Sequence, residues 1–295
     1  CGRVCHHPCE EKCNRREVDE PVSIRVIKRF LFDWVAKNGL MPYERGNNGE
    51  GARVAVVGAG PAGLTCALDL VLKGYRVTVF EKNEEPGGMM RWGIPAYRLP
   101  REVLEKEIQL ILDAGVELKL NSPVSSTTEL KALFNEGYQA VFVALGCQKS
   151  RTLEMPGVEL PGVMVALEFL RAVNQGKKVA IGKRVVVIGG GNVAVDCAMC
   201  ARRLGAEVVT MVCLEKRDEM PAHPWEIDEA EADGVKIMPG WGPKQIRGET
   251  GKVSGLEIME CVRVFDEAGR FNPQFNQENI RFVPGDTVIF AIGQA

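Results

Sequence analysis

The stretch RVAVVGAGPAGLTCALDLVLKGYRVTVFE, residues 53–81, decides the fold of this 295-residue chain. An apolar run comes first, and a glycine-rich turn separates it from a segment with helical apolar spacing. A second apolar run, 76–81, then ends on the carboxylate of Glu81. Strand, turn, helix and strand within about 30 residues are typical of a β-α-β unit with parallel strands.

The glycine-rich turn has the spacing that accommodates a dinucleotide. Gly58 permits a tight turn, Gly60 lets a pyrophosphate approach the backbone, and Gly63 permits close packing of helix on strand. Free N–H groups and the helix dipole favour an anion there. A carboxylate about 20 residues downstream accepts hydrogen bonds from ribose hydroxyls. The predicted binding residues are Gly58, Gly60, Pro61, Ala62, Gly63 and Glu81.

The same pattern recurs about 130 residues later, which is an internal repeat of a whole nucleotide-binding module. RVVVIG (184–189) predicts a strand, a turn and helix follow, and EVVTMVCLE (207–215) predicts the next strand. The motif residues are Gly189, Gly191, Asn192, Val193 and Ala194, with alanine as an accepted variant in the third slot. Two dinucleotide sites favour a flavin and a nicotinamide, with hydride passing between them.

The remaining periodicity continues the alternation of helices and strands. A β-hairpin is expected in 244–265, with Gly248 and Gly251 at its turn. The expected helices are 23–37, 101–115 and 127–135, and the further strands are 116–120, 140–145 and 287–293. This order predicts an α/β protein with two doubly wound domains.

Composition excludes several classes of protein. The chain is 45% hydrophobic and 26% charged with a net charge of −2, so nothing favours binding to nucleic acid or to an anionic membrane. No apolar stretch approaches the roughly 20 residues that span a bilayer. No secretory signal is evident, so we expect a cytoplasmic protein. The first residue is not Met, and we expect the natural N-terminus to lie further upstream.

The N-terminal CGRVCHHPCEEKC places four cysteines, Cys1, Cys5, Cys9 and Cys13, at every fourth position. On one helix they would span roughly 18 Å, too far for a single cluster, and Pro8 disfavours a continuous helix. They therefore either fold around one metal or contribute to more than one. Zinc usually takes two paired short spacings, which suits this pattern less well. Iron–sulfur ligation is the favoured interpretation.

A C-x-x-C pair, Cys197 and Cys200, lies inside the helix after the second glycine motif. Its small apolar neighbours favour core packing over a redox dithiol, which belongs at a helix N-terminus. His223 is interpreted as a structural or exposed loop residue. Two alternatives stay open: a disulfide reductase of the thioredoxin reductase type that uses this pair, and a non-enzymatic nucleotide-binding scaffold.

Together, CGRVCHHPCEEKC, VAVVGAGPAGL, EKNEEPGGMMRWGIPAYRLP, VVVIGGGNVAVDCA and EMPA resemble the glutamate synthase small-subunit family. The family includes the N-terminal half of dihydropyrimidine dehydrogenase. The resemblance runs over the whole chain, and PGGMMRWGIPAYRLP (86–100) is its most specific part. It implies two glutathione/thioredoxin reductase-like Rossmann domains, binding FAD and NAD(P)H, after a small helical module with two [4Fe–4S] clusters.

By position, the resemblance implies that Cys5 and Cys9 ligate one cluster and Cys13 the other, whereas Cys1 falls where relatives have no ligand. Relatives place a Gln or Glu ligand near Lys28, and lysine cannot take that role. The number of clusters, one or two, is therefore open. A flavin-contacting Gly-Asp stretch is expected after the last residue, so the chain is expected to be a fragment at both ends.

The resemblance also implies a domain plan. Residues 1–45 would form the iron–sulfur module, 46–147 with 291–295 the FAD domain, and 148–290 the NAD(P)H domain. The further cofactor-binding positions that it implies are Lys82, Gly88, Arg91, Gly146, Ala291 and Gly293.

The choice of nicotinamide cofactor depends on the end of the strand 207–215. Glu215 would bind the ribose 2′-hydroxyl and repel a 2′-phosphate. Family members that use NADPH often carry arginines where Leu214 and Glu215 stand, so the sequence favours NADH. Lys216 and Arg217 follow directly, and either is placed to reach a phosphate.

The resemblance implies an electron-transfer enzyme whose chemistry resides in its cofactors, so no catalytic side chain is predicted. NAD(P)H would reduce FAD, and electrons would pass through the clusters to a redox partner subunit or a ferredoxin-like acceptor. The expected assembly is a hetero-oligomeric complex, and the sequence does not identify the partner.

Overall fold

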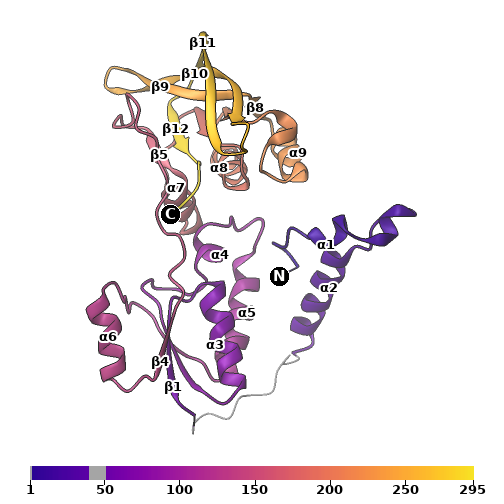
Figure 1. Ribbon diagram of the computed structural model, residues 1–295, viewed down its shortest axis with the longest axis vertical. Coiled ribbons are helices and arrows are strands. Elements are labelled where there is room, and N and C mark those ends of the chain that lie inside the picture. Colours follow the sequence, from indigo (N-terminus) through magenta and orange to yellow (C-terminus); the bar gives the residue numbers. More distant parts are fainter. Residues whose placement is uncertain (1, 40–50) are drawn as a thin grey trace. The chain divides into compact units, whose positions relative to one another are not determined.

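The computed structural model describes residues 2–39 and 51–295, in two compact units with their border between Gly146 and Cys147. Unit 1 comprises residues 1–146 and unit 2 comprises residues 147–295. In both, parallel strands are joined by helices (Figure 1), which confirms the predicted α/β class. Among the described residues, no helix is long and apolar enough to cross a membrane.

The N-terminal segment folds back along its own long helix. Arg3 forms an ion pair with Asp33 at 3.0 Å, and the backbone N–H of Arg25 donates to Oε1 of Glu10 at 2.7 Å. These contacts hold the cysteine-bearing stretch beside the helix that was expected at 23–37. The elements are α1 (Pro8–Glu11), the 3-10 helix η1 (Asn14–Glu17) and α2 (Ile24–Lys37).

Unit 1 also contains a four-stranded parallel sheet in the order β3-β2-β1-β4. The first β-α-β unit lies at its centre, since β1 pairs with β2 on one side and with β4 on the other. The strands are β1 (Arg53–Val57), β2 (Arg76–Phe80), β3 (Glu117–Lys119) and β4 (Ala140–Val143). The helices are α3 (Pro61–Leu72), α4 (Met89–Trp92), α5 (Arg101–Asp113) and α6 (Thr127–Asn135).

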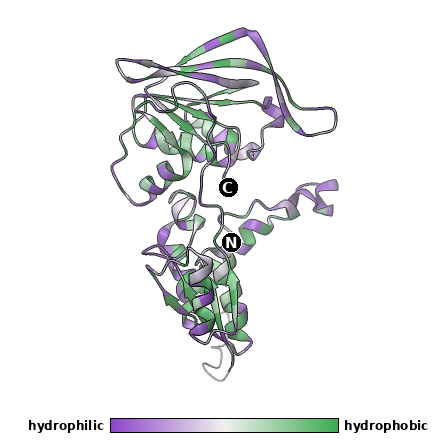
Figure 2. Cartoon of the chain, turned by 60° about the vertical axis from the view of Figure 1, so that its left-hand side comes forward, coloured by the Kyte–Doolittle hydropathy of each residue, from purple (hydrophilic) through white to green (hydrophobic). Residues whose placement is uncertain are grey.

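Alternating side chains of this sheet face two different helical layers. Val56 and Val79 pack in one cluster with Leu64 of α3. Ala55 faces the other way, in a cluster with Leu133 of α6. A helix–sheet–helix sandwich results, and its central strands are predominantly hydrophobic (Figure 2).

Unit 2 combines a five-stranded parallel sheet, β5-β12-β6-β7-β8, with a three-stranded antiparallel sheet, β11-β10-β9. Its strands are β5 (Val163–Val165), β6 (Arg184–Ile188), β7 (Val208–Cys213), β8 (Val235–Pro239), β9 (Trp241–Glu249), β10 (Lys252–Phe265), β11 (Phe271–Pro284) and β12 (Thr287–Phe290). Its helices are α7 (Ala166–Asn174), α8 (Asn192–Arg203), the 3-10 helix η2 (Arg217–Glu219) and α9 (Pro224–Ala232).

The parallel sheet of unit 2 separates two hydrophobic clusters. Val187 of β6 packs among residues of α7 and α8, including Phe169 and Val195. Its neighbour Val186 faces the opposite side and packs with Leu256 and Ile258 of the antiparallel sheet. Successive residues of β6 face opposite sides of the sheet, so this one strand contributes side chains to both hydrophobic clusters.

Two details of the hairpin region differ from expectation. Thr250 and Gly251, with φ of +52° and +77°, form the turn, whereas Gly248 lies within β9 and pairs with Val253. The third strand, β11, was not expected from the sequence. Its polar and apolar residues do not alternate cleanly, because most of the strand is exposed or only half-buried.

Candidate functional site

The first and third glycines of the first motif are required by packing. Gly58 has φ of +107°, and a Cβ there would lie 2.4 Å from the carbonyl oxygen of Ala144. A Cβ on Gly63 would lie 1.9 Å from the carbonyl oxygen of Gly58. Both positions therefore exclude any side chain, and they fix the turn between β1 and α3.

The second glycine of the motif faces open space. Gly60 caps α3 with φ of −77°, and a Cβ there would meet only the Cα of Gly88, at 3.9 Å, among the described atoms within 4 Å. Gly88, with φ of +54°, brings bare backbone from another segment to the same place. The start of α3, with Pro61 and Ala62, is thus uncovered. This is the cradle that a pyrophosphate requires, so these residues fit the diphosphate of FAD.

Glu81 lies at this turn, but it also holds the turn together. Its side chain is buried, and its Oε2 accepts a hydrogen bond from the backbone N–H of Ala59 at 2.8 Å. Oε1 accepts from the N–H of Asn83 at 2.9 Å, while Lys82 is exposed. The structure thus brings Glu81, but not Lys82, into the turn. Contacts of either residue with a ribose stay predictions.

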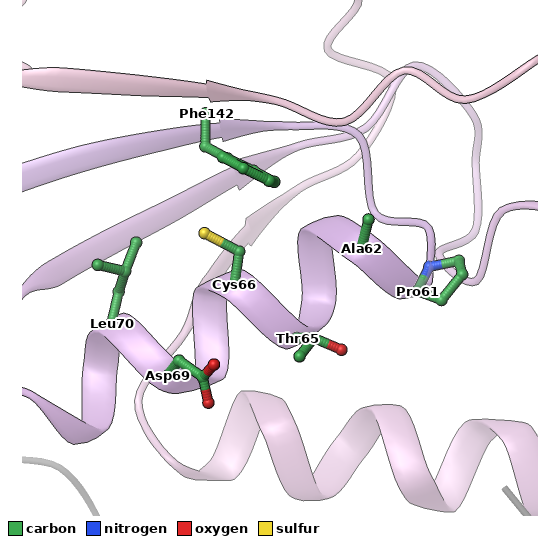
Figure 3. A pocket seen from close by; sticks show the side chains of 7 residues that line it. All are labelled: Pro61, Ala62, Thr65, Cys66, Asp69, Leu70 and Phe142. Carbon is green, nitrogen blue, oxygen red and sulfur yellow. The ribbon is translucent and has the colours of Figure 1, made fainter.

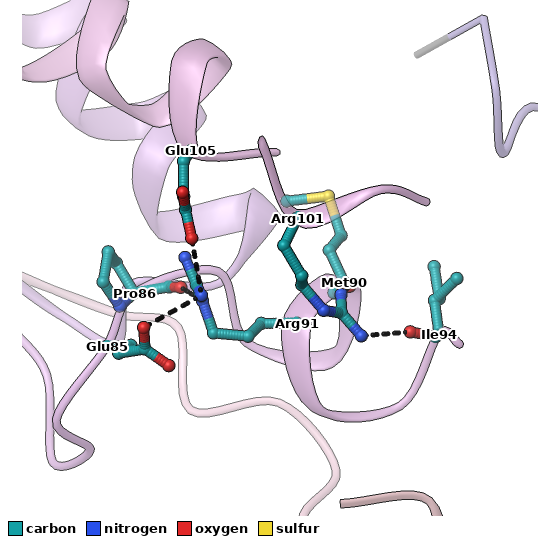
Figure 4. A network of polar contacts seen from close by, with 7 residues as sticks. All are labelled: Glu85, Pro86, Met90, Arg91, Ile94, Arg101 and Glu105. Atoms are coloured by element: carbon teal, nitrogen blue, oxygen red, sulfur yellow. Dashed lines mark hydrogen bonds and ion pairs between the residues drawn. The ribbon is translucent and has the colours of Figure 1, made fainter. Parts of the chain in front are cut away.

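Arg91, a predicted cofactor-binding residue, is buried in a network of polar contacts (Figure 4). Its Nε donates to the carbonyl oxygen of Pro86 at 2.7 Å, and Nη1 lies 3.1 Å from Glu85 and 3.4 Å from Glu105. The guanidinium therefore clamps the loop that presents Gly88. This contact makes Arg91 a positioning residue for the turn, and direct contact with a cofactor stays a prediction.

Arg101 supports the same loop from the next helix. Its Nη1 donates to the carbonyl oxygen of Met90 at 2.9 Å and its Nη2 to that of Ile94 at 2.8 Å (Figure 4). Burial and the neighbouring charge of Arg91 lower the pKa of Arg101 from its usual value. The stretch 86–100, which contains the short helix α4, is thus held by Arg91 and Arg101.

The second glycine motif repeats the geometry of the first. Gly189 has φ of +139°, and a Cβ there would lie 2.3 Å from the carbonyl oxygen of Ala291. A Cβ on Gly191, where φ is −94°, would meet only Pro221 Cγ, at 3.9 Å, among the described atoms within 4 Å. The second glycine is again open, and it caps the helix that begins with Asn192 and Val193.

Alanine fits the third slot of this motif because its methyl group has room. Ala194 is fully buried and its methyl group packs in the hydrophobic core of unit 2. In the first motif the same slot is so close to the Gly58 carbonyl that only glycine fits. The two turns therefore differ in the residue of the third slot, while the middle glycine is open in both.

A loop to which no role was assigned from the sequence is hydrogen-bonded to the second turn. The backbone N–H of Ala222 donates to the carbonyl oxygen of Gly190 at 3.1 Å, and that of His223 donates to Oδ1 of Asn192 at 3.3 Å. The His223 ring stacks on Trp225 with 4.5 Å between ring centroids. The available signal was EMPA, residues 219–222, which carried family resemblance but no assigned function.

The three residues predicted to select the nicotinamide cofactor are placed differently. Glu215 lies at the turn, since a Cβ on Gly190 would come within 3.0 Å of its Oε2. Lys216 is exposed. Arg217 is bound to α9, with Nη2 at 3.2 Å from Asp228 and 2.6 Å from Glu231. The structure brings Glu215, but not the guanidinium of Arg217, to the glycine turn.

Three predicted cofactor-binding residues follow β4 and β12. Two of them, Gly146 and Gly293, have a left-handed backbone, and the third, Ala291, contacts the second glycine turn. Gly146 has φ of +66° and Gly293 has φ of +105°. Ala291 supplies the carbonyl that covers Gly189. Residues 149–151 and 293–295 pair within unit 2, with Arg151 N–H donating to Gly293 at 3.0 Å. Cofactor contacts of these residues, and the predicted domain borders, stay predictions.

A hollow flanks α3 beside the sheet edge formed by β4 (Figure 3). Phe142 extends from β4 toward the helix, and Cys66 and Leu70 point toward the strand. Burial raises the pKa of the Cys66 thiol. Pro61 and Ala62 line the hollow, but none of the three motif glycines does. The hollow therefore lies on the flank of the turn rather than in front of it.

The predicted cluster ligands lie in the N-terminal segment, and backbone donors point at two of their sulfurs. The N–H of His7 donates to Sγ of Cys5 at 3.4 Å. Hydrogen bonds from the backbone of Val22 and Arg15 lower the pKa of the Cys13 thiol. Backbone donors aimed at sulfur suit thiolate ligands of an iron–sulfur cluster.

The described cysteines of the N-terminal segment are not grouped closely enough to form a metal site by themselves. Cys9 is exposed, and no group of three or more His, Cys, Asp or Glu side chains could hold a metal ion within residues 2–39 and 51–295. Cys1 lies outside the described residues. Ligation by Cys5, Cys9 and Cys13 stays a prediction, and their donor chemistry fits it.

Cys197 and Cys200 are buried in the core of unit 2, as expected from their neighbours. Burial raises the pKa of Cys197 well above its usual value. A buried, protonated thiol is a poor nucleophile. These observations disfavour the disulfide reductase alternative.

Comparison with known proteins places the chain in a family. Residues 52–295 match the model of the pyridine nucleotide-disulphide oxidoreductase family, and residues 1–40 match that of dihydropyrimidine dehydrogenase domain II, 4Fe-4S cluster. These matches confirm the predicted cofactor classes, a flavin with a pyridine nucleotide and a 4Fe–4S cluster.

Individual relatives support the same placement. The chain is 41% identical, over its full length and 45% of the relative, to the NADP(+)-dependent formate dehydrogenase subunit beta of Moorella thermoacetica. It is 35% identical, over 99% of the chain and 65% of the relative, to the glutamate synthase [NADPH] small chain of Escherichia coli K12. The chain thus spans about half the length of its first relatives.

Solved structures confirm the fold. FprA from Mycobacterium tuberculosis (His57Gln mutant) aligns with a TM-score of 0.70 at 21% identity, covering 83% of this chain and 71% of that one. With the resemblance to the glutamate synthase small chain confirmed and both segments matched, the chain belongs to the pyridine nucleotide-disulphide oxidoreductase family and carries an N-terminal segment of the dihydropyrimidine dehydrogenase 4Fe-4S type.

Proposed function

We propose that this chain is the NAD(P)H-oxidising part of a flavin- and iron–sulfur-dependent electron-transfer enzyme. Unit 1 would bind FAD at the turn around Gly60, and unit 2 would bind NAD(P)H at the turn around Gly191. The N-terminal cysteines would ligate [4Fe–4S] clusters. In this plan, residues 46–147 with 291–295 form the FAD domain and 148–290 form the NAD(P)H domain.

One observation carries the proposal. Gly58 and Gly63 in the first motif and Gly189 in the second exclude a side chain, while the middle glycine of each motif has ordinary φ and open space in front of it. Packing alone does not require glycine at Gly60 or Gly191, because alanine would fit both positions. A bare backbone is useful there if a diphosphate approaches the N–H groups of the following helix.

The cofactors would supply the redox chemistry: the flavin accepts a hydride from the nicotinamide, and iron–sulfur clusters carry single electrons onward. The protein's tasks are binding and orientation. Glu81 fixes the first turn through Ala59, and Arg91 holds the loop that presents Gly88. Ala222 and His223 fix the second turn. No side chain is required as a general acid or base.

The electron acceptor is proposed to be a partner subunit or a ferredoxin-like protein. Two relatives are named as subunits or chains of larger enzymes, which supports an assembly of more than one chain. The exposed Cys9 and the half-buried Cys5 and Cys13 would place the clusters near the surface of the segment. Electron transfer between proteins requires a short distance between the donor and acceptor groups, which clusters near the surface would provide.

The visible absorption spectrum and the iron and acid-labile sulfide content of anaerobically purified protein test the proposal. Flavin bands above a broad iron–sulfur shoulder are expected, and both should bleach when NADH or NADPH is added. A colourless protein that binds neither flavin nor iron would overturn the proposal and favour the nucleotide-binding scaffold.

A further inference from the structure

Two oppositely charged residues, Glu215 and Arg217, follow the end of β7. The structure gives their side chains different surroundings. Glu215 points back to the glycine turn, where a Cβ on Gly190 would lie 3.0 Å from its Oε2. Its backbone is also fixed, because its carbonyl oxygen accepts from the N–H of Gly240 at 2.8 Å. The backbone after β7 is thus fixed by Gly240, and the carboxylate of Glu215 lies at the edge of the turn.

Arg217 is held away from that edge by an acidic pair on α9. Its Nη2 lies 3.2 Å from Oδ1 of Asp228 and 2.6 Å from Oε2 of Glu231. The two carboxylates stand three residues apart on one helix, so they share a face and can bind one guanidinium together. Both contacts engage Nη2 and hold the guanidinium against α9.

Acidic groups outnumber basic ones around this strand end. Lys216 is exposed, and its backbone N–H donates to the carboxylate of Glu219 at 3.3 Å. Within 215–219 and on the face of α9 that binds Arg217, the acidic groups are Glu215, Asp218, Glu219, Asp228 and Glu231, and the basic groups are Lys216 and Arg217. A ribose 2′-hydroxyl can donate to a carboxylate here, whereas a 2′-phosphate brings further negative charge to an acidic site.

We propose that unit 2 selects NADH over NADPH, and that selection has two parts: Glu215 accepts the ribose hydroxyls, and Asp228 with Glu231 withholds Arg217 from a 2′-phosphate. This inference rests on the proposed function, since it requires the second glycine turn to bind the nicotinamide cofactor. It gives the chain a specificity opposite to that stated in the names of two relatives, which specify NADP(+) and NADPH.

The test is calorimetric binding of two probes without a nicotinamide, ADP-ribose and 2′-phospho-ADP-ribose, to the purified full chain. Wild-type protein is expected to bind ADP-ribose at least about tenfold more tightly. Glu215→Gln should reduce this ratio about tenfold, because it removes the charge but keeps the size of the side chain.

The acidic pair is tested by releasing the arginine. Asp228→Asn with Glu231→Gln should tighten 2′-phospho-ADP-ribose binding about tenfold, and adding Arg217→Ala should abolish that gain. Glu207→Gln is the matched control, since it breaks a comparable ion pair with Lys183 at 2.7 Å, before the first residue of the same strand. It should change neither affinity by more than about twofold.

The outcomes distinguish failure of the proposed NADH selection from failure of the proposed nucleotide site. Equal or tighter binding of the 2′-phosphate by wild-type protein would overturn the selection of NADH and leave the nucleotide site intact. No gain in the Asp228→Asn, Glu231→Gln protein would overturn the role of the acidic pair. Binding of neither probe would overturn both this inference and the proposed site in unit 2.

Discussion

A Cβ atom placed on Gly88 would lie 2.7 Å from the Cα of Gly60, so two segments meet as bare backbone at the start of α3. Gly60 belongs to the turn after β1, and Gly88 belongs to the loop that Arg91 clamps. Only glycine at position 88 allows this approach. The contact links the general dinucleotide motif to the stretch 86–100, which we expected to be the most specific part of the family resemblance.

The open face of Gly60 predicts a clean loss of flavin. Gly60→Val should fold, because φ is −77° and the space is free, but its side chain should occupy the path of the pyrophosphate. Gly63→Ala is the contrasting variant, since its Cβ would lie 1.9 Å from a carbonyl oxygen and should cost about 3 kcal/mol or more of stability. Flavin content and thermal unfolding distinguish them. Normal flavin content in Gly60→Val would refute the assignment.

Removal of single N-terminal thiols should release iron. Cys5→Ser, Cys9→Ser and Cys13→Ser should each lower the iron content of anaerobically purified protein, because a weaker hydroxyl ligand replaces a thiolate. Cys147→Ser is a suitable control, since that cysteine is also exposed but lies in unit 2. Unchanged iron in all three ligand variants would show that other residues hold the metal.

The buried pair in α8 should be dispensable for electron transfer. Replacing both Cys197 and Cys200 by Ala should leave NADH-dependent reduction of a dye within about threefold of wild type, since their thiols are buried in the core. Some loss of thermal stability is expected from the small cavities. Abolished activity in a folded variant would support the disulfide reductase alternative.

The ion pair between Asp286 and Arg184 predicts a pH-dependent contribution to stability. Arg184 lies 2.7 Å from Asp286 and its side-chain hydrogen bond lowers the pKa of that carboxyl. A depressed pKa stabilises the fold above the unfolded value of about 4, and the contribution is lost as pH falls through the folded pKa. Asp286→Asn should cost about 1 kcal/mol at pH 7.

The same variant should match wild type once the pH falls below the lowered pKa of the folded Asp286 carboxyl, where that group is protonated. Denaturant unfolding at several pH values measures this difference. The control is Glu207→Gln, which removes a more exposed ion pair and should have no measurable effect on unfolding. An Asp286→Asn deficit that stays constant with pH would contradict the electrostatic explanation.

The sequence predicted the parts of the fold that are repetitive and local. The apolar runs and glycine motifs predicted β1, α3, β2 and their repeat β6, α8, β7, since a continuous apolar run and the glycine spacing are encoded within a few residues. The strand β11 was not predicted, because its residues are mostly exposed or half-buried and show no hydrophobic alternation.

The site was predicted less completely than the fold. The structure brings the motif glycines and Glu215 to the turns, but the pairing of Arg217 with Asp228 and Glu231 joins residues from different elements. Nor could sequence spacing reveal that Arg91 is clamped by backbone and carboxylates, or that Ala222 covers Gly190. Such contacts depend on tertiary packing and are invisible to a local pattern.

Anaerobic reduction of the bound flavin by NADH tests the central claim, that two separate turns hold the two dinucleotides. Wild-type flavin should bleach rapidly. Gly191→Val should retain flavin but reduce it at least about a hundredfold more slowly at low NADH, because the side chain enters the open face of the second turn. Flavin that is reduced in Gly191→Val as fast as in wild type would contradict the account.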